Sequence, residues 1–298
     1  MSRGRQWNGI KTGSLAESDI LVLGVPFDGA VSRAYGAAVG PARIRDLSKK
    51  NISFSEEGVD LCDLTIYDQG DVPVDRDWSH YYGEVEKQAA VLMQTGKFSL
   101  FLGGDHSITI PVSNAFARHY HHDSVGMIHL DAHCDLMDIY NGQRWSHACP
   151  QRRFLEHDNA SPENLVLIGI RYYEAEELAF LREKPAISVV GAGDFFREGH
   201  SGTMKKIYKA MRGAGAIYLS IDIDVLDPAY APGTGTPEAG GLSTRQLIEL
   251  VREVMVSLPV KAVDLVEVAP PLDHSDITSR AALKIICEIF AALVPSKA

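Results

Sequence analysis

A short acidic stretch around a histidine is the first feature of this sequence that could do chemistry. Asp131, His133 and Asp135 are spaced two residues apart, directly after the apolar-rich run 124–130. In an extended chain alternate side chains share a face, so these three would project together. Two crowded carboxylates repel each other, and one is driven to take up a proton unless a cation lies between them. The stretch therefore predicts a bound divalent metal ion.

Two further motifs supply ligands of the same kind. Asp222 and Asp224 are again two residues apart with apolar residues between and around them, and His106 follows a Gly-Gly turn. Unpaired carboxylates in an apolar run are costly, which favours a ligand role. The four carboxylates and two imidazoles exceed the about four ligands of one tetrahedral zinc ion. They suit two harder divalent ions, manganese first, which together can activate water to attack an electrophilic carbon.

The elements that must position these residues alternate between strands and helices. Short apolar runs predict strands near 19–24, 64–67, 99–102, 125–130, 165–170, 187–190, 216–221 and 260–268. A 3.6-residue spacing of apolar residues predicts helices near 41–48, 81–94, 108–119, 174–183, 203–212, 243–254 and 283–290. This alternation indicates a largely parallel sheet, either open or closed into a barrel. Because sites form at the carboxyl ends of such strands, His106, Asp131, Asp222 and Glu267 should meet at one rim.

Composition limits the class of protein. The 298 residues carry a net charge of −10, and no run of Lys and Arg would bind a nucleic-acid backbone, whereas a small cationic substrate is not repelled. The four scattered cysteines argue against a disulfide framework. We find neither a signal-peptide core nor an apolar run of about 18 residues. We therefore expect one globular domain, residues 1–298, in the cytoplasm, without nucleic-acid or membrane partners.

Several motifs together resemble a known family. Gly-Gly-Asp-His-Ser (103–107), Asp-Ala-His-Cys-Asp (131–135) and Ser-Ile-Asp-Ile-Asp-Val-Leu-Asp-Pro (220–228) are similar to the three metal-binding signatures of the ureohydrolases, which include arginase and agmatinase. Segments 24–30 and 231–242 extend the likeness over nearly the whole chain. The resemblance implies a three-layer α/β/α sandwich with an eight-stranded parallel sheet rather than a barrel. It also implies a homo-oligomer, a trimer or a hexamer.

The resemblance further implies a binuclear manganese centre, with Ni²⁺ or Co²⁺ as other ions that such a site can take. One ion would be held by His106, Asp131, Asp135 and Asp224, and the other by His133, Asp131, Asp135 and Asp222. In this family, water activated by the metal pair attacks the guanidinium carbon of the substrate. The products are urea and an amine.

The resemblance also assigns roles to residues beside the substrate. His147 matches a histidine that shuttles protons or orients the substrate, and an imidazole that titrates near neutrality suits that role. Glu267 matches the glutamate that pairs with the guanidinium through two parallel hydrogen bonds. We expect Asp135 to act in catalysis as well as in metal binding, and Asn141 to contact the substrate. The two residues after His147 depart from the family pattern, which affects the wall of the pocket.

The substrate is predicted from the loops. Segment 266–278 resembles the agmatinase branch, and loop 136–142 lacks the polar pattern with which arginase recognises a free amino acid. We therefore expect hydrolysis of agmatine to putrescine and urea, a step of polyamine biosynthesis. Arginine, guanidinobutyrate, guanidinopropionate, guanidine and formiminoglutamate stay open, because relatives with the same metal core take them. Two other classes also stay open. The presence of both His106 and His133 disfavours a zinc deacetylase with one metal ion, and the intact metal ligands disfavour an inactive paralogue.

Overall fold

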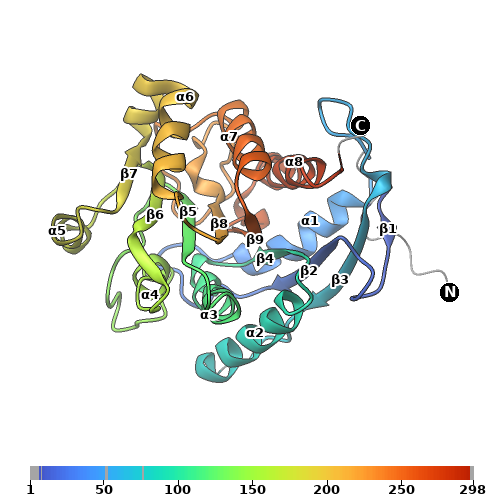
Figure 1. Cartoon of the computed structure of the whole chain (residues 1–298), viewed down its shortest axis with the longest axis horizontal. Coiled ribbons are helices and arrows are strands. Elements are labelled where there is room, and N and C mark those ends of the chain that lie inside the picture. The colour runs from blue at the N-terminus through green and yellow to red at the C-terminus, as the bar shows by residue number, and fades with distance from the viewer. Residues whose placement is uncertain (1–6, 8, 51–52, 76, 296–298) are drawn as a thin grey trace.

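The chain is built around one parallel β-sheet (Figure 1). The computed structural model describes residues 7, 9–50, 53–75 and 77–295. The strands are β1 (Lys11–Thr12), β2 (Ile20–Val25), β3 (Thr65–Asp71), β4 (Phe98–Gly103), β5 (Val125–Leu130), β6 (Ala160–Ile170), β7 (Ser188–Gly191), β8 (Ala216–Asp222) and β9 (Val260–Val266). Their order across the sheet is β1-β3-β2-β4-β9-β8-β5-β6-β7, with every pair parallel. The sheet is therefore open, which decides against the barrel.

Helices cover both faces of the sheet (Figure 1). They are α1 (Gly40–Ser48), α2 (Trp78–Met93), α3 (Thr109–His119), α4 (Pro150–Phe154), α5 (Ala175–Glu183), α6 (Ala192–Ala210), α7 (Thr244–Ser257) and α8 (Ile277–Ala291), with 3-10 turns η1 (Ala37–Val39), η2 (Leu61–Asp63), η3 (His106–Ile108), η4 (Ile223–Val225) and η5 (Pro270–Leu272). The apolar sides of α1, α6, α7 and α8 join one hydrophobic cluster, and those of α2 and α3 join another. Strands β2, β4, β5 and β8 are buried throughout, and such strands need a helical layer on each face. The expected three-layer α/β/α fold is confirmed.

The sheet differs from expectation by one strand, since the described residues form nine instead of eight. The additional strand, β1, consists of two exposed residues paired with β3 at the edge. An exposed pair has no apolar run, so the sequence pattern could not reveal it. Helix α4 was not predicted either, and α6 begins at Ala192 rather than near Thr203. Gly199 kinks α6 with φ 69° and ψ −177°, which interrupts the helical spacing of its first half.

The strand order explains why four separated motifs meet at one rim. The chain forms β2, β3 and β4 on one side, crosses to β5, and later returns through β8 and β9 to fill the gap. β4, β9, β8 and β5 are therefore neighbours. Their carboxyl ends lead to His106, Glu267, Asp222 and Asp131, respectively. The rim that these loops form is the place where a parallel α/β sheet binds its ligands.

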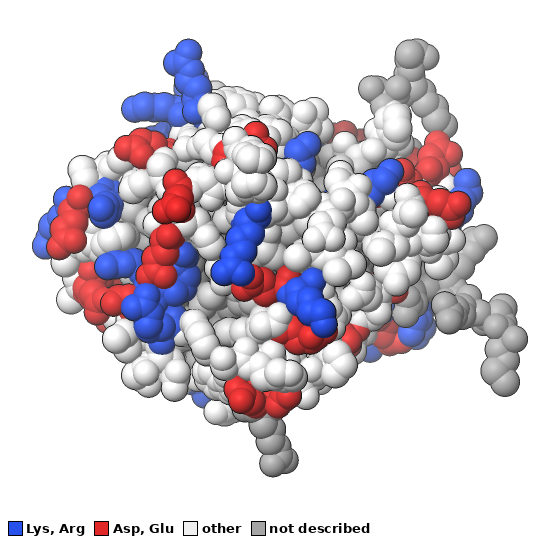
Figure 2. Space-filling model, turned by 60° about the horizontal axis from the view of Figure 1, so that its bottom comes forward, with Lys and Arg blue, Asp and Glu red and all other residues white. Residues whose placement is uncertain are grey.

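Charged side chains of both signs are mixed over the surface. On the face in Figure 2, Lys and Arg side chains lie among Asp and Glu side chains. Ion pairs such as those of Arg118 with Glu86 and Arg197 with Asp194 show this mixing locally. Within the described ranges, no helix has both the length and the apolar character needed to span a membrane. Most of the N-terminal segment considered for a signal peptide lies outside the described residues.

Candidate active site

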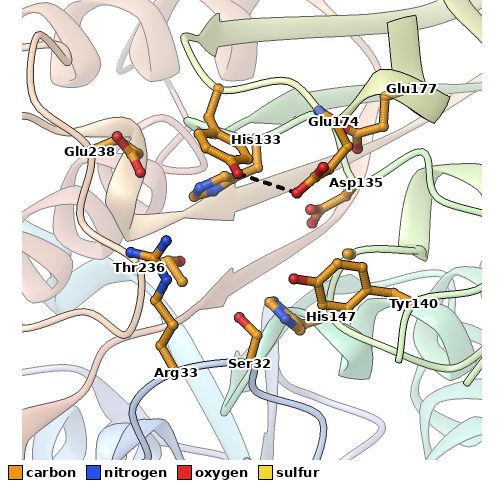
Figure 3. Close-up of a pocket in the computed structure, with 12 residues that line it drawn as sticks. Ser32, Arg33, His133, Asp135, Tyr140, His147, Glu174, Glu177, Thr236 and Glu238 are labelled. Atoms are coloured by element: carbon orange, nitrogen blue, oxygen red, sulfur yellow. Dashed lines mark hydrogen bonds between the residues drawn. The ribbon is translucent and has the colours of Figure 1, made fainter. Parts of the chain in front are cut away.

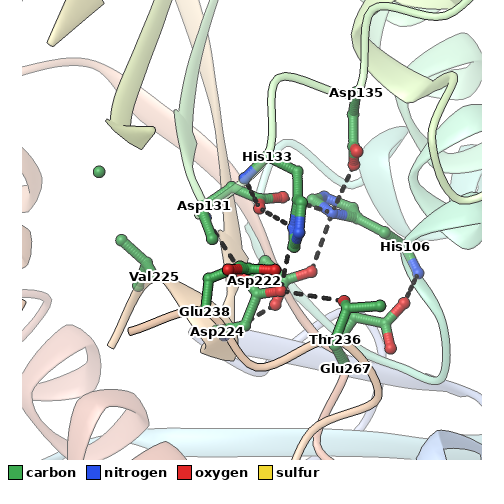
Figure 4. A network of polar contacts seen from close by, with 12 residues as sticks. His106, Asp131, His133, Asp135, Asp222, Asp224, Val225, Thr236, Glu238 and Glu267 are labelled. Atoms are coloured by element: carbon green, nitrogen blue, oxygen red, sulfur yellow. Dashed lines mark hydrogen bonds and ion pairs between the residues drawn. The ribbon is translucent and has the colours of Figure 1, made fainter. Parts of the chain in front are cut away.

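The imidazole of His106 points its Nδ1 atom at three buried carboxylates (Figure 4). This atom lies 3.0 Å from Asp131 Oδ2, 3.0 Å from Asp135 Oδ2 and 3.2 Å from Asp222 Oδ2. His106 Nδ1 and Asp131 Oδ2 are buried, and neither forms a hydrogen bond with any other described residue. Buried polar atoms in native proteins are almost always satisfied. Their convergence without hydrogen bonds is what a site for a cation requires.

The imidazole of His133 forms the second half of the cluster. Its Nδ1 atom lies 3.2 Å from Asp131 Oδ1 and 3.1 Å from Asp224 Oδ2, and ligand atoms of these three residues lie within 4.8 Å of one another. Asp131 thus contacts both histidines. Asp222 lies beside His106 and Asp224 beside His133, which is the reverse of the distribution that the family resemblance implied.

The four aspartates carry an unfavourable concentration of negative charge. Each is at most 5% exposed. Burial, followed by repulsion from Asp131, raises the pKa of Asp135 to about 7. Burial and the neighbouring carboxylates likewise raise the pKa of Asp222 well above its usual range and raise the pKa of Asp224. A divalent cation removes this conflict, and the mixture of carboxylate oxygen and imidazole nitrogen fits such an ion.

A buried hydrogen-bond chain fixes the orientation of His106. Its Nε2 atom lies 2.8 Å from Ser220 Oγ, which in turn donates to Asp264 Oδ1 at 2.8 Å. The hydroxyls of Tyr218 and Thr109 both donate to Asp264 Oδ2 at 2.6 Å. Since the Ser220 hydroxyl donates to Asp264, it accepts from the His106 Nε2–H. The lone pair on Nδ1 is then free for a cation, and metal-binding histidines are commonly oriented in this way.

His129 is a site residue that the sequence analysis missed. Its Nε2 atom lies 3.0 Å from the His133 carbonyl, and its Nδ1 atom lies 2.8 Å from Gln151 Nε2. The Gln151 backbone N–H donates to the Asp135 carbonyl at 3.1 Å, so these two residues hold the ligand loop from both sides. Burial lowers the pKa of His129 to about 4. Its position two residues before Asp131, on the same strand face, is the signal that could have identified it.

Two site residues have a backbone conformation that side chains rarely adopt. Asp135 has φ 54° and Glu267 has φ 62°, both in the left-handed region. Such conformations persist where surrounding structure enforces them, and they cluster at functional sites. Glu267 is buried, and its Oε1 atom accepts a hydrogen bond from the His106 backbone N–H at 2.9 Å. Burial, then the charge of Asp105, raises the pKa of Glu267 well above its usual range.

A cavity opens onto the cluster (Figure 3). His133 and Asp135 line it together with His147 and Tyr140. His147 Nε2 is buried and has no hydrogen-bond partner among the described residues. Burial, followed by the charges of His133 and His106, lowers the pKa of His147 to about 4, below the near-neutral value expected from the sequence, so its imidazole is neutral at pH 7. Asn141 is exposed in a turn with φ 49°, outside the set of described residues that line the cavity.

Charged residues from three loops complete the outer wall of the cavity. They are Arg33, Glu174 and Glu238. The Tyr172 hydroxyl donates to Glu174 Oε1 at 3.2 Å. The Glu238 carbonyl accepts from Arg171 Nε at 3.1 Å and from Nη2 at 2.8 Å. Single charged residues in loops have no spacing pattern, so their place in the cavity wall cannot be predicted from the sequence.

Comparison with known proteins identifies the family of the chain. Residues 18–292 match the Arginase family. The chain is 36% identical over 284 residues to an agmatinase from Bacillus anthracis, and the alignment covers 94% of each protein. It is 35% identical over 283 residues to a guanidinopropionase from Pseudomonas aeruginosa, and that alignment covers 93% of this chain and 87% of the guanidinopropionase. The structure of proclavaminate amidino hydrolase from Streptomyces clavuligerus superposes with a TM-score of 0.85 at 32% identity, covering 95% of both chains. The chain therefore belongs to the arginase family and is a ureohydrolase that acts on carbon–nitrogen bonds.

Proposed function

We propose that this enzyme hydrolyses agmatine to putrescine and urea with two Mn²⁺ ions. The observation that carries the proposal is the convergence of two imidazole nitrogens and four buried carboxylates at one rim of the sheet. The proposed ligands are His106, Asp131, His133, Asp135, Asp222 and Asp224. Their contacts favour Asp222 on the His106 side, Asp224 on the His133 side, and Asp131 between the two. Ni²⁺ and Co²⁺ are the alternative ions.

The side chains around the ligands have distinct roles in the proposed reaction. When bound, the ions supply Lewis-acid activation of the attacking water. Glu267 binds the substrate guanidinium, because one carboxylate oxygen holds the His106 N–H and leaves the other oxygen for a charge-assisted bond. Asp135 accepts the proton of the attacking water. His147, neutral at pH 7, takes a proton and passes it to the departing amine.

The identity of the substrate rests on the outer wall of the cavity. The relatives named above have nearly equal identity to this chain, yet one is an agmatinase and the other a guanidinopropionase. Overall similarity therefore does not select the substrate. The carboxylates of Glu174 and Glu238 line the same cavity as the metal cluster and would attract the ammonium group of agmatine. We also propose that the enzyme is cytoplasmic and forms a homo-oligomer of three or six chains. Sedimentation of the purified enzyme tests the number of chains.

Metal analysis and a urea assay test the proposal directly. Protein purified with Mn²⁺ should contain close to two ions per chain and release urea from agmatine. A screen of agmatine, arginine, guanidinobutyrate, guanidinopropionate and guanidine, with added Mn²⁺ or Ni²⁺, ranks the alternatives by kcat/KM. A single tightly held zinc ion, or no urea from any of these compounds, would contradict the proposal.

His147→Ala should slow the reaction without removing the metal. The loss of a positioned proton carrier is expected to lower kcat by about 10²-fold, the lower end of the range for general acid–base catalysis. Metal content and kcat are measured on the same preparation, with the exposed His122→Ala as a matched control. Loss of ions from the His147 variant would instead identify it as a ligand.

A further inference from the structure

The cavity wall contains one positive side chain whose role the proposed reaction does not explain. Arg33 lines the cavity that also contains His133 and Asp135. In Figure 3 its guanidinium extends from a loop to a position beside Thr236. Among the described residues, Arg33 has neither a salt bridge nor a side-chain hydrogen bond. Its charge faces the space where a substrate tail would lie, and it would repel the ammonium group of agmatine.

The loop that carries Arg33 is held in place at both ends. Asp28 Oδ2 accepts from the Gly36 N–H at 2.8 Å, which closes the loop across its base. Asp105 Oδ2 accepts from the Ala30 N–H at 2.8 Å, which ties the loop to the turn before His106. The backbone of Gly104 also packs so closely on this loop that a Cβ at Gly104 would lie 1.8 Å from the Phe27 carbonyl oxygen. Arg33 therefore extends from a backbone positioned by the metal-binding turn itself.

The chemistry of Arg33 points to one class of partner. A guanidinium presents a planar fork of donors that matches a carboxylate through two parallel hydrogen bonds. The other charged groups of the outer wall, Glu174 and Glu238, have the opposite preference and attract an ammonium. We propose that Arg33 binds the carboxylate at the far end of ω-guanidino acids, so that the cavity accepts these acids as well as agmatine. This inference rests on the proposed guanidine hydrolysis.

Arg33→Ala tests the assignment when two substrates of opposite tail charge are compared. The wild-type enzyme loaded with Mn²⁺ should release urea from both agmatine and 4-guanidinobutyrate. In the variant, loss of a charge-assisted pair should lower kcat/KM for 4-guanidinobutyrate by about 10- to 100-fold. Agmatine should gain, because a like charge has been removed from its path. The ratio of kcat/KM for 4-guanidinobutyrate to kcat/KM for agmatine should therefore fall.

Two further variants separate this role from a structural one. Arg33→Lys keeps the charge but loses the planar fork, so it should recover part of the activity on 4-guanidinobutyrate. Arg212→Ala removes an exposed guanidinium from the turn before β8, at the opposite rim, and should leave the ratio unchanged. Thermal unfolding of each variant checks the fold.

The outcomes distinguish this inference from the function on which it rests. Wild-type activity on agmatine with none on 4-guanidinobutyrate overturns the assignment of Arg33. An unchanged ratio in Arg33→Ala, including an equal loss on both substrates, also overturns it. If the Mn²⁺-loaded wild type releases urea from neither substrate, the proposed function itself is overturned.

Discussion

Asp222→Asn is expected to abolish manganese binding at the His106 side of the centre and to lower kcat by at least about 10³-fold, since a metal supplies several kcal/mol to such hydrolysis. Asp222 Oδ2 lies 3.2 Å from His106 Nδ1, and Asp222 Oδ1 accepts the Asp224 N–H at 2.8 Å. Asparagine keeps the shape and one oxygen acceptor for that N–H. The substitution thus removes the charge with little change in packing.

The stability of the metal-free protein gives this prediction a second readout. Burial and the neighbouring carboxylates disfavour the ionised form of Asp222 more than His106 favours it, so a neutral side chain costs the metal-free fold little. Without metal, the variant should unfold at the wild-type temperature or above it. Bound ions stabilise the wild type by mass action, and that Mn²⁺-dependent increase in Tm should shrink in the variant. Exposed Asp158→Asn is the control, and a variant that keeps two ions and full activity contradicts the assignment.

Glu267→Gln is expected to lower kcat/KM by about 10²- to 10³-fold while metal content stays the same, because the lost charge-assisted hydrogen bond contributes about 1.5–3 kcal/mol and the donor left facing the guanidinium adds a further penalty. The amide oxygen can still accept the His106 N–H that Glu267 Oε1 accepts now. The amide NH₂ would then face the substrate guanidinium with donors instead of an acceptor. A site with a mismatched buried polar group rejects its ligand strongly.

Steady-state kinetics and metal analysis on one preparation measure this effect. Turnover equal to that of the wild type would remove the assigned role of Glu267. Loss of metal would have a different meaning, because the Glu267 carboxylate also holds the backbone of His106. A near-normal far-ultraviolet circular dichroism spectrum and a near-normal Tm are therefore needed to show that the variant is folded.

The strands and helices that position the site were largely predictable from the sequence, because buried strands are apolar runs and amphipathic helices have a regular spacing. The strand expected at 125–130 is β5 itself, and the helix expected at 174–183 differs from α5 by one residue. The elements that were missed lack these patterns. β1 is two exposed residues, α4 is five residues long, and Gly199 divides α6.

The candidate site was predictable where a motif has internal spacing and not where single residues come together. The six proposed ligands lie in short motifs, and the structure brings all six to one cluster. Which aspartate faces which histidine depends on the turns after β5 and β8, and no sequence spacing encodes that. Arg33 and Glu238 are more than 200 residues apart and share a cavity only because of the strand order.

The loops of the outer wall have anchors of their own in addition to their contacts with the metal-binding turns. Asp28 closes the loop of Arg33, and the capping box with Glu177 holds the segment of Glu174. The carbonyl of Glu238 is held by its hydrogen bonds from Arg171. Mutations in these loops can therefore change the preferred substrate during evolution while the hydrolytic cluster stays intact. A directed-evolution library confined to loop positions 31–35, 172–175 and 237–239 would sample new guanidino substrates at the lowest risk of losing the reaction.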